Sequence, residues 1–123
     1  MITKDSVYQA KMQQDGNFVV YKDQGAIWAS NTAGVGTGPY ILRMQSDNNL
    51  VVYDTNDQAR WSSNTRTDHA SANNGFVQMQ DDGNLVVYRG DGIPLWKSGT
   101  FGGKSSNKMG TGYLLTGKII LYL

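Results

Sequence analysis

Three short stretches of the chain place hydroxyl-binding side chains at every second position. They read Met-Gln-x-Asp-x-Asn-apolar-Val-Val-Tyr and begin at Met12, Met44 and Met79. Alternate residues of a strand share one face, so the amides, the carboxylate and the phenol of each copy face the same way. Amides and carboxylates bind vicinal hydroxyls as donors or acceptors, and the valine offers an apolar wall, which predicts a polyol site. The predicted binding residues are Gln13, Asp15, Asn17, Val19 and Tyr21; Gln45, Asp47, Asn49, Val51 and Tyr53; and Gln80, Asp82, Asn84, Val86 and Tyr88.

The three copies are an internal repeat. Their glutamines lie 32 and 35 residues apart, and a tryptophan follows each tyrosine after 7 or 8 residues. A repeat of this length is one small structural unit that buries its apolar face against its neighbours. We expect repeats at 8–32, 40–65 and 75–100 within a single domain that spans 1–123. The tryptophans are Trp28, Trp61 and Trp96.

Composition favours an all-β protein. Among 123 residues there are 15 glycines, and short β-branched runs alternate with Gly, Asn and Asp turns without a helical period. The net charge of +1 predicts no attraction to nucleic acid, and the absence of cysteine excludes disulfides and thiolate metal sites. No apolar run is long enough to span a bilayer. The start "MITKDSVYQA" shows no signal peptide, so the sequence predicts no localisation.

The motif also predicts the register of its hairpin. A three-residue loop at 14–16 places Gln13 opposite Asn17 and Met12 opposite Phe18. Such loops end in a residue with positive φ, and the third loop positions are Gly16, Asn48 and Gly83, which tolerate it. A two-residue loop would mix polar and apolar side chains on each face, so we prefer the three-residue register.

Each repeat holds about four short strands, and one such sheet cannot bury its apolar face alone. In the third repeat we expect strands at 75–80, 84–89 and 94–97, with a fourth piece leading in or out. Three sheets around one axis would form a three-sided prism. The constant position of the tryptophans after the hairpin favours a role in the core at that axis over a role as sugar-stacking platforms.

With these three motif copies, the sequence resembles the monocot mannose-binding, bulb-type lectin family. The signature Gln-x-Asp-x-Asn-x-Val-x-Tyr occurs intact three times. The resemblance implies the β-prism II fold, with three four-stranded antiparallel sheets around a pseudo-threefold axis. It also implies cofactor-free, metal-independent binding of terminal α-mannosides, with no enzyme activity. The aspartate and asparagine would bind the axial 2-hydroxyl, the glutamine the 3-hydroxyl and the tyrosine the 4-hydroxyl.

The chain departs from the plant members in three ways, one of which is a shorter lead-in before the first motif. It lacks the disulfide that those members usually carry, and a strand-like tail, 110–123, extends past the third repeat. The tail would close its own prism or exchange with a partner chain. Since family members often exchange a C-terminal strand, we expect a homodimer that binds mannose-containing glycans.

Other roles for these residues explain less of the pattern. The Asp and Asn residues could serve only the turn, but turn chemistry does not explain the recurring glutamine and tyrosine. A glycosidase needs two facing carboxylates, and each motif offers one aspartate. The motif lacks the spacing of a calcium loop, and the single histidine, His69, is expected to be a solvated loop residue. The alternative function is a lectin-like or bacteriocin-type module that binds a protein or a bacterial surface polysaccharide.

Overall fold

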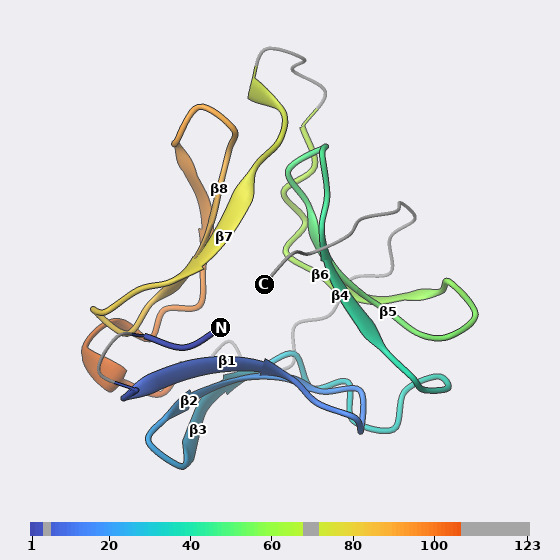
Figure 1. Cartoon of the computed structure of the whole chain (residues 1–123), viewed down its shortest axis with the longest axis horizontal. Helices are drawn as coiled ribbons and strands as arrows, with labels where there is room; N and C mark the ends of the chain where they lie inside the picture. Colours follow the sequence, from blue (N-terminus) through green and yellow to red (C-terminus); the bar gives the residue numbers. More distant parts are fainter. Residues whose placement is uncertain (4–5, 68–71, 107–123) are drawn as a thin grey trace.

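The chain folds into three antiparallel sheets of three strands each. The computed structural model describes residues 1–3, 6–67 and 72–106; His69 and the tail 110–123 lie outside them. Figure 1 shows the sheets as the three sides of a triangle around a central axis. The predicted prism is therefore confirmed. The strands are β1 (Tyr8–Met12), β2 (Phe18–Lys22), β3 (Gly25–Ala29), β4 (Ile41–Met44), β5 (Leu50–Tyr53), β6 (Ala59–Ser62), β7 (Phe76–Met79), β8 (Leu85–Tyr88) and β9 (Pro94–Lys97).

The first two strands of each sheet form the predicted hairpin. Met12 pairs with Phe18, and the N–H of Gln13 donates to the carbonyl of Asn17 at 2.9 Å. The corresponding bonds in the second and third hairpins measure 2.8 and 2.9 Å. The last loop residue has positive φ in every copy, which confirms the three-residue register. These residues are Gly16 (97°), Asn48 (74°) and Gly83 (96°).

A β-bulge interrupts the second pairing of each sheet at the same place. The register between β2 and β3 shifts between Val20 and Tyr21, and the same shift precedes Tyr53 and Tyr88. A bulge twists its strand and re-aims the side chain beside it. The bulge thus lies directly before the motif tyrosine in all three sheets.

The three tryptophans fill the axis of the prism. Their ring centroids lie 5.3–5.5 Å apart in all three pairings, at interplanar angles of 70–72°. This edge-to-face geometry is favourable for aromatic rings. Each tryptophan pairs with the fully buried second valine of its motif: Val20 with Trp28, Val52 with Trp61, and Val87 with Trp96. The expectation that the tryptophans belong to the core is confirmed.

The expectation of four strands per sheet differs from the structure. The described residues form three strands per sheet. The piece that follows β3 turns instead of extending, with left-handed φ at Asn31, Gly34 and Gly36. After β9 the chain forms a short 3-10 turn, Phe101–Gly103, also with left-handed glycines. Left-handed residues interrupt an extended ladder at these positions. Single contacts extend the first sheet beyond its three strands: Ile2 bridges Gln9 of β1, and the N–H of Ser106 donates to the carbonyl of Ile27 in β3 at 2.9 Å.

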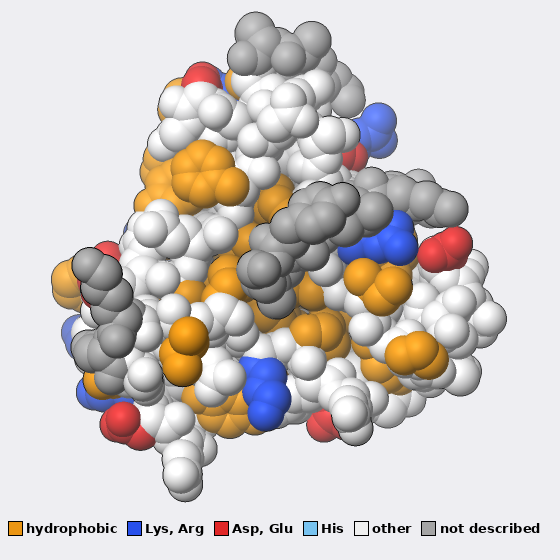
Figure 2. Space-filling model, in the orientation of Figure 1, with side chains coloured by type: hydrophobic (Ala, Val, Ile, Leu, Met, Phe, Trp, Pro, Cys, Tyr) orange, Lys and Arg blue, Asp and Glu red, His pale blue; other side chains and the backbone are white. Residues whose placement is uncertain are grey.

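Charged side chains are scattered over the surface. On the face shown in Figure 2, the lysine and arginine side chains are spread over several places, some of them next to acidic side chains, and form no single basic or acidic patch. In residues 1–3, 6–67 and 72–106, no group of three or more His, Cys, Asp or Glu side chains lies together as metal ligands would. Within the same residues, no helix is long and apolar enough to cross a membrane.

Candidate functional sites

The motif aspartates brace the hairpin loops with one carboxylate oxygen. Oδ1 of Asp15 accepts the N–H of Asn17 at 2.9 Å, and the second and third copies repeat the bond at 3.1 and 2.9 Å. This is an Asx-turn, so the turn role considered from sequence is present. It uses one oxygen of each carboxylate and leaves Oδ2 for other partners. Turn formation and ligand binding are therefore compatible in the same residue.

The motif asparagines are oriented by the segment that follows each tryptophan. Oδ1 of Asn17 accepts the backbone N–H of Thr32 at 3.2 Å. The equivalent bonds, from Thr65 to Asn49 and from Thr100 to Asn84, measure 3.1 and 3.0 Å. Because the oxygen is engaged inward, the Nδ2 group of each asparagine is the free end and can donate to a ligand oxygen.

A repeated Ser-x-Thr pair, which lies outside the predicted binding motif, holds each loop. In the first repeat, Ser30 Oγ accepts the N–H of Phe18 at 2.9 Å and contacts Thr32 Oγ1 at 2.7 Å. Thr32 Oγ1 donates to the carbonyl of Gly16 at 2.6 Å. The signal was visible in the recurring "WASNT", "WSSNT" and "WKSGT". The equivalent pairs are Ser63 with Thr65 and Ser98 with Thr100.

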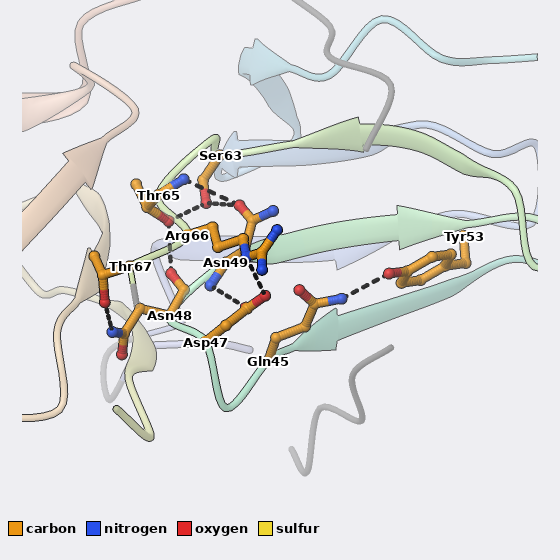
Figure 3. A network of polar contacts seen from close by, with 9 residues as sticks. All are labelled: Gln45, Asp47, Asn48, Asn49, Tyr53, Ser63, Thr65, Arg66 and Thr67. Carbon is orange, nitrogen blue, oxygen red and sulfur yellow. Dashed lines mark hydrogen bonds and ion pairs between the residues drawn. The ribbon is translucent and has the colours of Figure 1, made fainter. Parts of the chain in front are cut away.

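Glutamine and tyrosine form the other end of each site. Gln45 Nε2 donates to the hydroxyl of Tyr53 at 2.6 Å, and Gln13 bonds Tyr21 in the same way. The predicted residues thus lie on one face of each hairpin, with the carboxylate at the loop and the phenol toward the bulge. Figure 3 shows this order along β4, the loop and β5.

In the third site the glutamine connects both ends. The surroundings of Gln80 favour the amide orientation in which Oε1 accepts from the Tyr88 hydroxyl. In that orientation Nε2 lies 3.2 and 3.1 Å from the two carboxylate oxygens of Asp82. Amide orientation is assigned from the hydrogen-bond network. One side chain therefore links the carboxylate and the phenol.

The motif valines lie on the predicted face, but they are more buried than side chains that contact a sugar directly would be. Val19, Val51 and Val86 are 2%, 0% and 5% exposed. The glutamine and tyrosine of each motif bond to each other across the same face. A ligand would reach the valine only as that bond opens.

The second site is more enclosed than the other two. Gln45, Asn49 and Tyr53 are 1–2% exposed, whereas their equivalents in the first and third sites are half-buried. Burial raises the pKa of Tyr53; the Asp47 carboxylate adds to the rise, and the Gln45 hydrogen bond opposes it. The guanidinium of Arg43 lies 5.6 Å from the centroid of the Tyr53 ring. Tyr53 is therefore a phenol that stays protonated above the usual range for tyrosine.

Three buried polar atoms in or beside the second motif have no hydrogen-bond partner. These atoms are Oε1 of Gln45, Oδ1 of Asn48 and Nε of Arg43. An unpaired buried polar atom costs about 1–3 kcal/mol, and such exceptions call for a functional explanation. At the other end of this site, Arg66 Nε lies 3.8 Å from Asp47 Oδ2.

Sequence comparison identifies the family. Residues 27–106 match the sequence profile of the family described as D-mannose binding lectin. The chain belongs to this family. The B-type lectin plumieribetin of Scorpaena plumieri is 42% identical over 65 residues, which cover 53% of this chain and 55% of the relative. A mannose-specific lectin of Aloe arborescens is 40% identical over 60 residues, covering 49% of this chain and 54% of the relative.

Solved lectin structures share the fold over most of the chain. A monomeric monocot mannose-binding lectin from Gastrodia elata superimposes with a TM-score of 0.69 at 39% identity, covering 76% of this chain and 81% of that one. The snowdrop (Galanthus nivalis) agglutinin complexed with methyl-α-D-mannoside gives 0.61 at 37% identity, covering 76% and 80%. The β-prism II fold is thereby confirmed, and the family and the fold are those of lectins rather than enzymes. The chain spans about half the length of the curated relatives described above.

Proposed function

We propose that the chain is a metal-independent lectin that recognises terminal α-mannosides at up to three sites. The observation that carries the proposal is the threefold recurrence of one hydrogen-bonding arrangement. In every copy the turn bond leaves Oδ2 of the aspartate for side-chain or ligand partners, the asparagine keeps Nδ2, and the glutamine lies beside the tyrosine hydroxyl. A scaffold would need only the turn bonds, whereas these additional groups point to a ligand rich in hydroxyls.

The roles of the residues follow the family pattern. We expect the aspartate and asparagine to bind the axial 2-hydroxyl, which distinguishes mannose from glucose. The carboxylate accepts a hydrogen bond from this hydroxyl while the amide donates one to it. The glutamine binds the 3-hydroxyl and the tyrosine the 4-hydroxyl, so both must exchange their mutual bond for bonds to the sugar.

Affinity at each site should be weak. A hexose has about a dozen non-hydrogen atoms, and at about −0.3 kcal/mol per atom the binding free energy is roughly −4 kcal/mol, or a Kd near 1 mM. Useful recognition of a glycan then requires several sites on one particle. This need supports the further proposal that the chain forms a homodimer through its C-terminal strand segment, which analytical ultracentrifugation would test.

The deciding experiment is a calorimetric titration with methyl α-mannoside in the presence of EDTA. Methyl α-glucoside serves as the matched control because it differs at the 2-hydroxyl. Saturable heat with the mannoside and none with the glucoside is expected. An absence of binding at several times the expected Kd would overturn the mannose proposal, and loss of binding only with EDTA would overturn its metal independence.

A further inference from the structure

The three sites differ at positions beside the motif. The register places one first-strand residue directly opposite each motif tyrosine: Gln9 opposite Tyr21, Ile41 opposite Tyr53, and Phe76 opposite Tyr88. Directly opposed residues of an antiparallel pair have neighbouring side chains. The tyrosine end of each site is therefore bordered by a different chemical group: an amide, an aliphatic side chain or an aromatic ring.

In the third site the bordering group is an exposed ring stacked on the binding tyrosine. The centroids of Phe76 and Tyr88 lie 4.9 Å apart with an interplanar angle of 18°. Phe76 is 44% exposed, so nearly half of an aromatic side chain faces solvent at the edge of the site. Core packing does not explain this position, because the tryptophan cluster lies on the opposite face of the sheet.

Exposed apolar side chains and one ion pair lie near this ring in the described part of the third repeat. Pro94 pairs with Tyr88 on its other side and is exposed, and the neighbouring Ile93 is 46% exposed. The adjoining turn holds Arg89, whose Nε donates to Asp91 Oδ1 at 2.8 Å. The arginine and aspartate neutralise each other. Such a strip suits the C–H face of a neutral pyranose.

We propose that Phe76 forms a second saccharide subsite next to the third motif. The occupant is the sugar unit linked to the mannose held by Gln80, Asp82, Asn84 and Tyr88. The C–H face of this unit would pack on the exposed part of the Phe76 ring. This inference rests on the proposed mannose function. It goes further by assigning to the third site a preference for α-linked oligomannosides over a single mannose.

Continuity with the motif supports a sugar as the occupant. Tyr88 belongs at once to the proposed mannose site and to the stacked pair, so the unit next to the mannose reaches Phe76 without leaving the surface. An aromatic contact is typically worth about a three- to tenfold change in affinity. The first site, bordered by Gln9, offers no ring and should lack this preference.

The test follows individual sites by NMR. The backbone amides of Gly16 and Gly83, in the first and third loops, report the two sites within one protein. Methyl α-mannoside and α1,2-, α1,3- and α1,6-linked dimannosides are titrated separately. At the site reported by Gly83, at least one dimannoside should bind about three- to tenfold tighter than the monosaccharide. At the site reported by Gly16, the gain in affinity should be smaller.

The variant Phe76→Gln copies the residue type of the first site. It should reduce the dimannoside-to-monosaccharide affinity ratio at Gly83 to that at Gly16. Ile41→Gln is the matched control, because Ile41 has the same register position and the same exposure of 44%. The control should leave the ratio at Gly83 unchanged. Melting temperatures verify that both variants fold.

The outcomes separate this inference from the function on which it rests. If methyl α-mannoside shifts neither glycine, the mannose proposal itself fails. If it binds but Phe76→Gln leaves the ratio at Gly83 unchanged, or weakens both ligands equally, Phe76 only positions Tyr88 and the subsite is disproved. If Phe76→Gln instead changes the sedimentation coefficient without changing the ratio, the strip is a contact between copies and the subsite is likewise rejected.

Discussion

Asn48 packs against Gly75, and there is room for the asparagine side chain because glycine has none. Asn48 ends the second hairpin loop, and a Cβ atom built on Gly75 would lie 2.5 Å from its Oδ1. At the other two boundaries between repeats the loop residue is a glycine and the neighbour is a tyrosine. A Cβ at those positions would lie 2.7 Å from the ring of the neighbour at one boundary and 2.9 Å at the other. These pairs are Gly16 with Tyr40 and Gly83 with Tyr8.

In the second loop the larger residue is on the loop and the glycine is on the neighbouring repeat, the reverse of the other two boundaries. This size exchange explains why the second loop can hold an asparagine. The side chain of Asn48 is completely buried and replaces the ring that packs on the other loops. Its Nδ2 donates to Thr67 Oγ1 at 2.5 Å and to the carbonyl of Ala72 at 3.1 Å. The amide therefore links the second loop to the segment that leads into the third repeat.

Substitution of Gly75 should destabilise the protein. In Gly75→Ala the new methyl group would overlap Asn48 Oδ1 and the carbonyl oxygen of Tyr88. Overpacking of this kind costs about 1–3 kcal/mol, which urea denaturation would measure. Gly25→Ala is the control, because its nearest neighbour is the Lys22 carbonyl at 3.7 Å. Equal losses of unfolding free energy in both variants would contradict the size exchange.

The hairpins were predictable because local chemistry determines them. Polar alternation and the residue types at Gly16 and Asn48 fixed the register, and the repeated tryptophans indicated the axis. The exchange between Asn48 and Gly75 was not predictable, because it depends on which repeat packs against which loop. The depth of Val51 and the enclosure of the second site depend on side chains that cover the sheet, which no period in the sequence describes.

The Ser-x-Thr pair should control ligand affinity from behind the site. Thr32→Val keeps the shape of the side chain but removes the bond to the Gly16 carbonyl and the contact with Ser30. Both partners are buried, so we expect a loss of about 1–3 kcal/mol of unfolding free energy. Mannoside affinity at the first site should fall as well, because the same loop carries Asp15.

NMR titration at Gly16 and Gly83 would measure the effect of Thr32→Val site by site. The first site should weaken and the third should not, since Thr100 supports the third loop independently. Thr37→Val is a control at an exposed position of the same connection. A uniform weakening of both sites by Thr32→Val would show a global effect and reject the local one.

The spare oxygen of the motif aspartate should carry binding at the first site. Asp15→Asn keeps an Oδ1 acceptor for the N–H of Asn17 and replaces Oδ2 by an NH₂ group. A hydrogen bond to a charged group is worth about 1.5–3 kcal/mol, which corresponds to a loss of roughly 10- to 100-fold in mannoside affinity. Calorimetric titration should then show one mannoside site fewer per chain, and the melting temperature of the variant should be unchanged. Asp23→Asn, at an exposed turn, should retain all sites.

Arg43 should keep the second site weaker than the others. It lies over Tyr53, whereas Lys11 and Gln78 occupy the equivalent positions opposite the motif valines of the other sites. In the wild type, the first and third sites should fill before the second. Arg43→Gln should strengthen mannoside binding severalfold at the second site, followed by NMR at the Asn48 amide. If Arg43→Gln left mannoside affinity at the second site unchanged, Arg43 would not be the cause of weak binding there.

A buried ion pair beside the second site should make stability depend on pH. Asp54 is completely buried and lies 2.9 Å from Arg60 Nη2. Burial alone would raise the pKa of Asp54, but the N–H of Gln58, the Arg60 guanidinium and the N–H of Asn56 outweigh it and lower the pKa. Stabilisation by this carboxylate is therefore fully present above the pKa of the unfolded chain. It is lost as the pH falls through the folded pKa, because the unfolded state then binds more protons.

Asp54→Asn should accordingly destabilise the protein at neutral pH and less so in acid. Urea denaturation of both proteins from about pH 7 to about pH 2 should show their unfolding free energies converging as the pH falls. Asp91→Asn is the control, because Asp91 pairs with Arg89 at an exposed turn and exposed pairs contribute little. A gap between wild type and Asp54→Asn that stays constant down to the lowest pH would show that the charge of Asp54 does not produce the stabilisation.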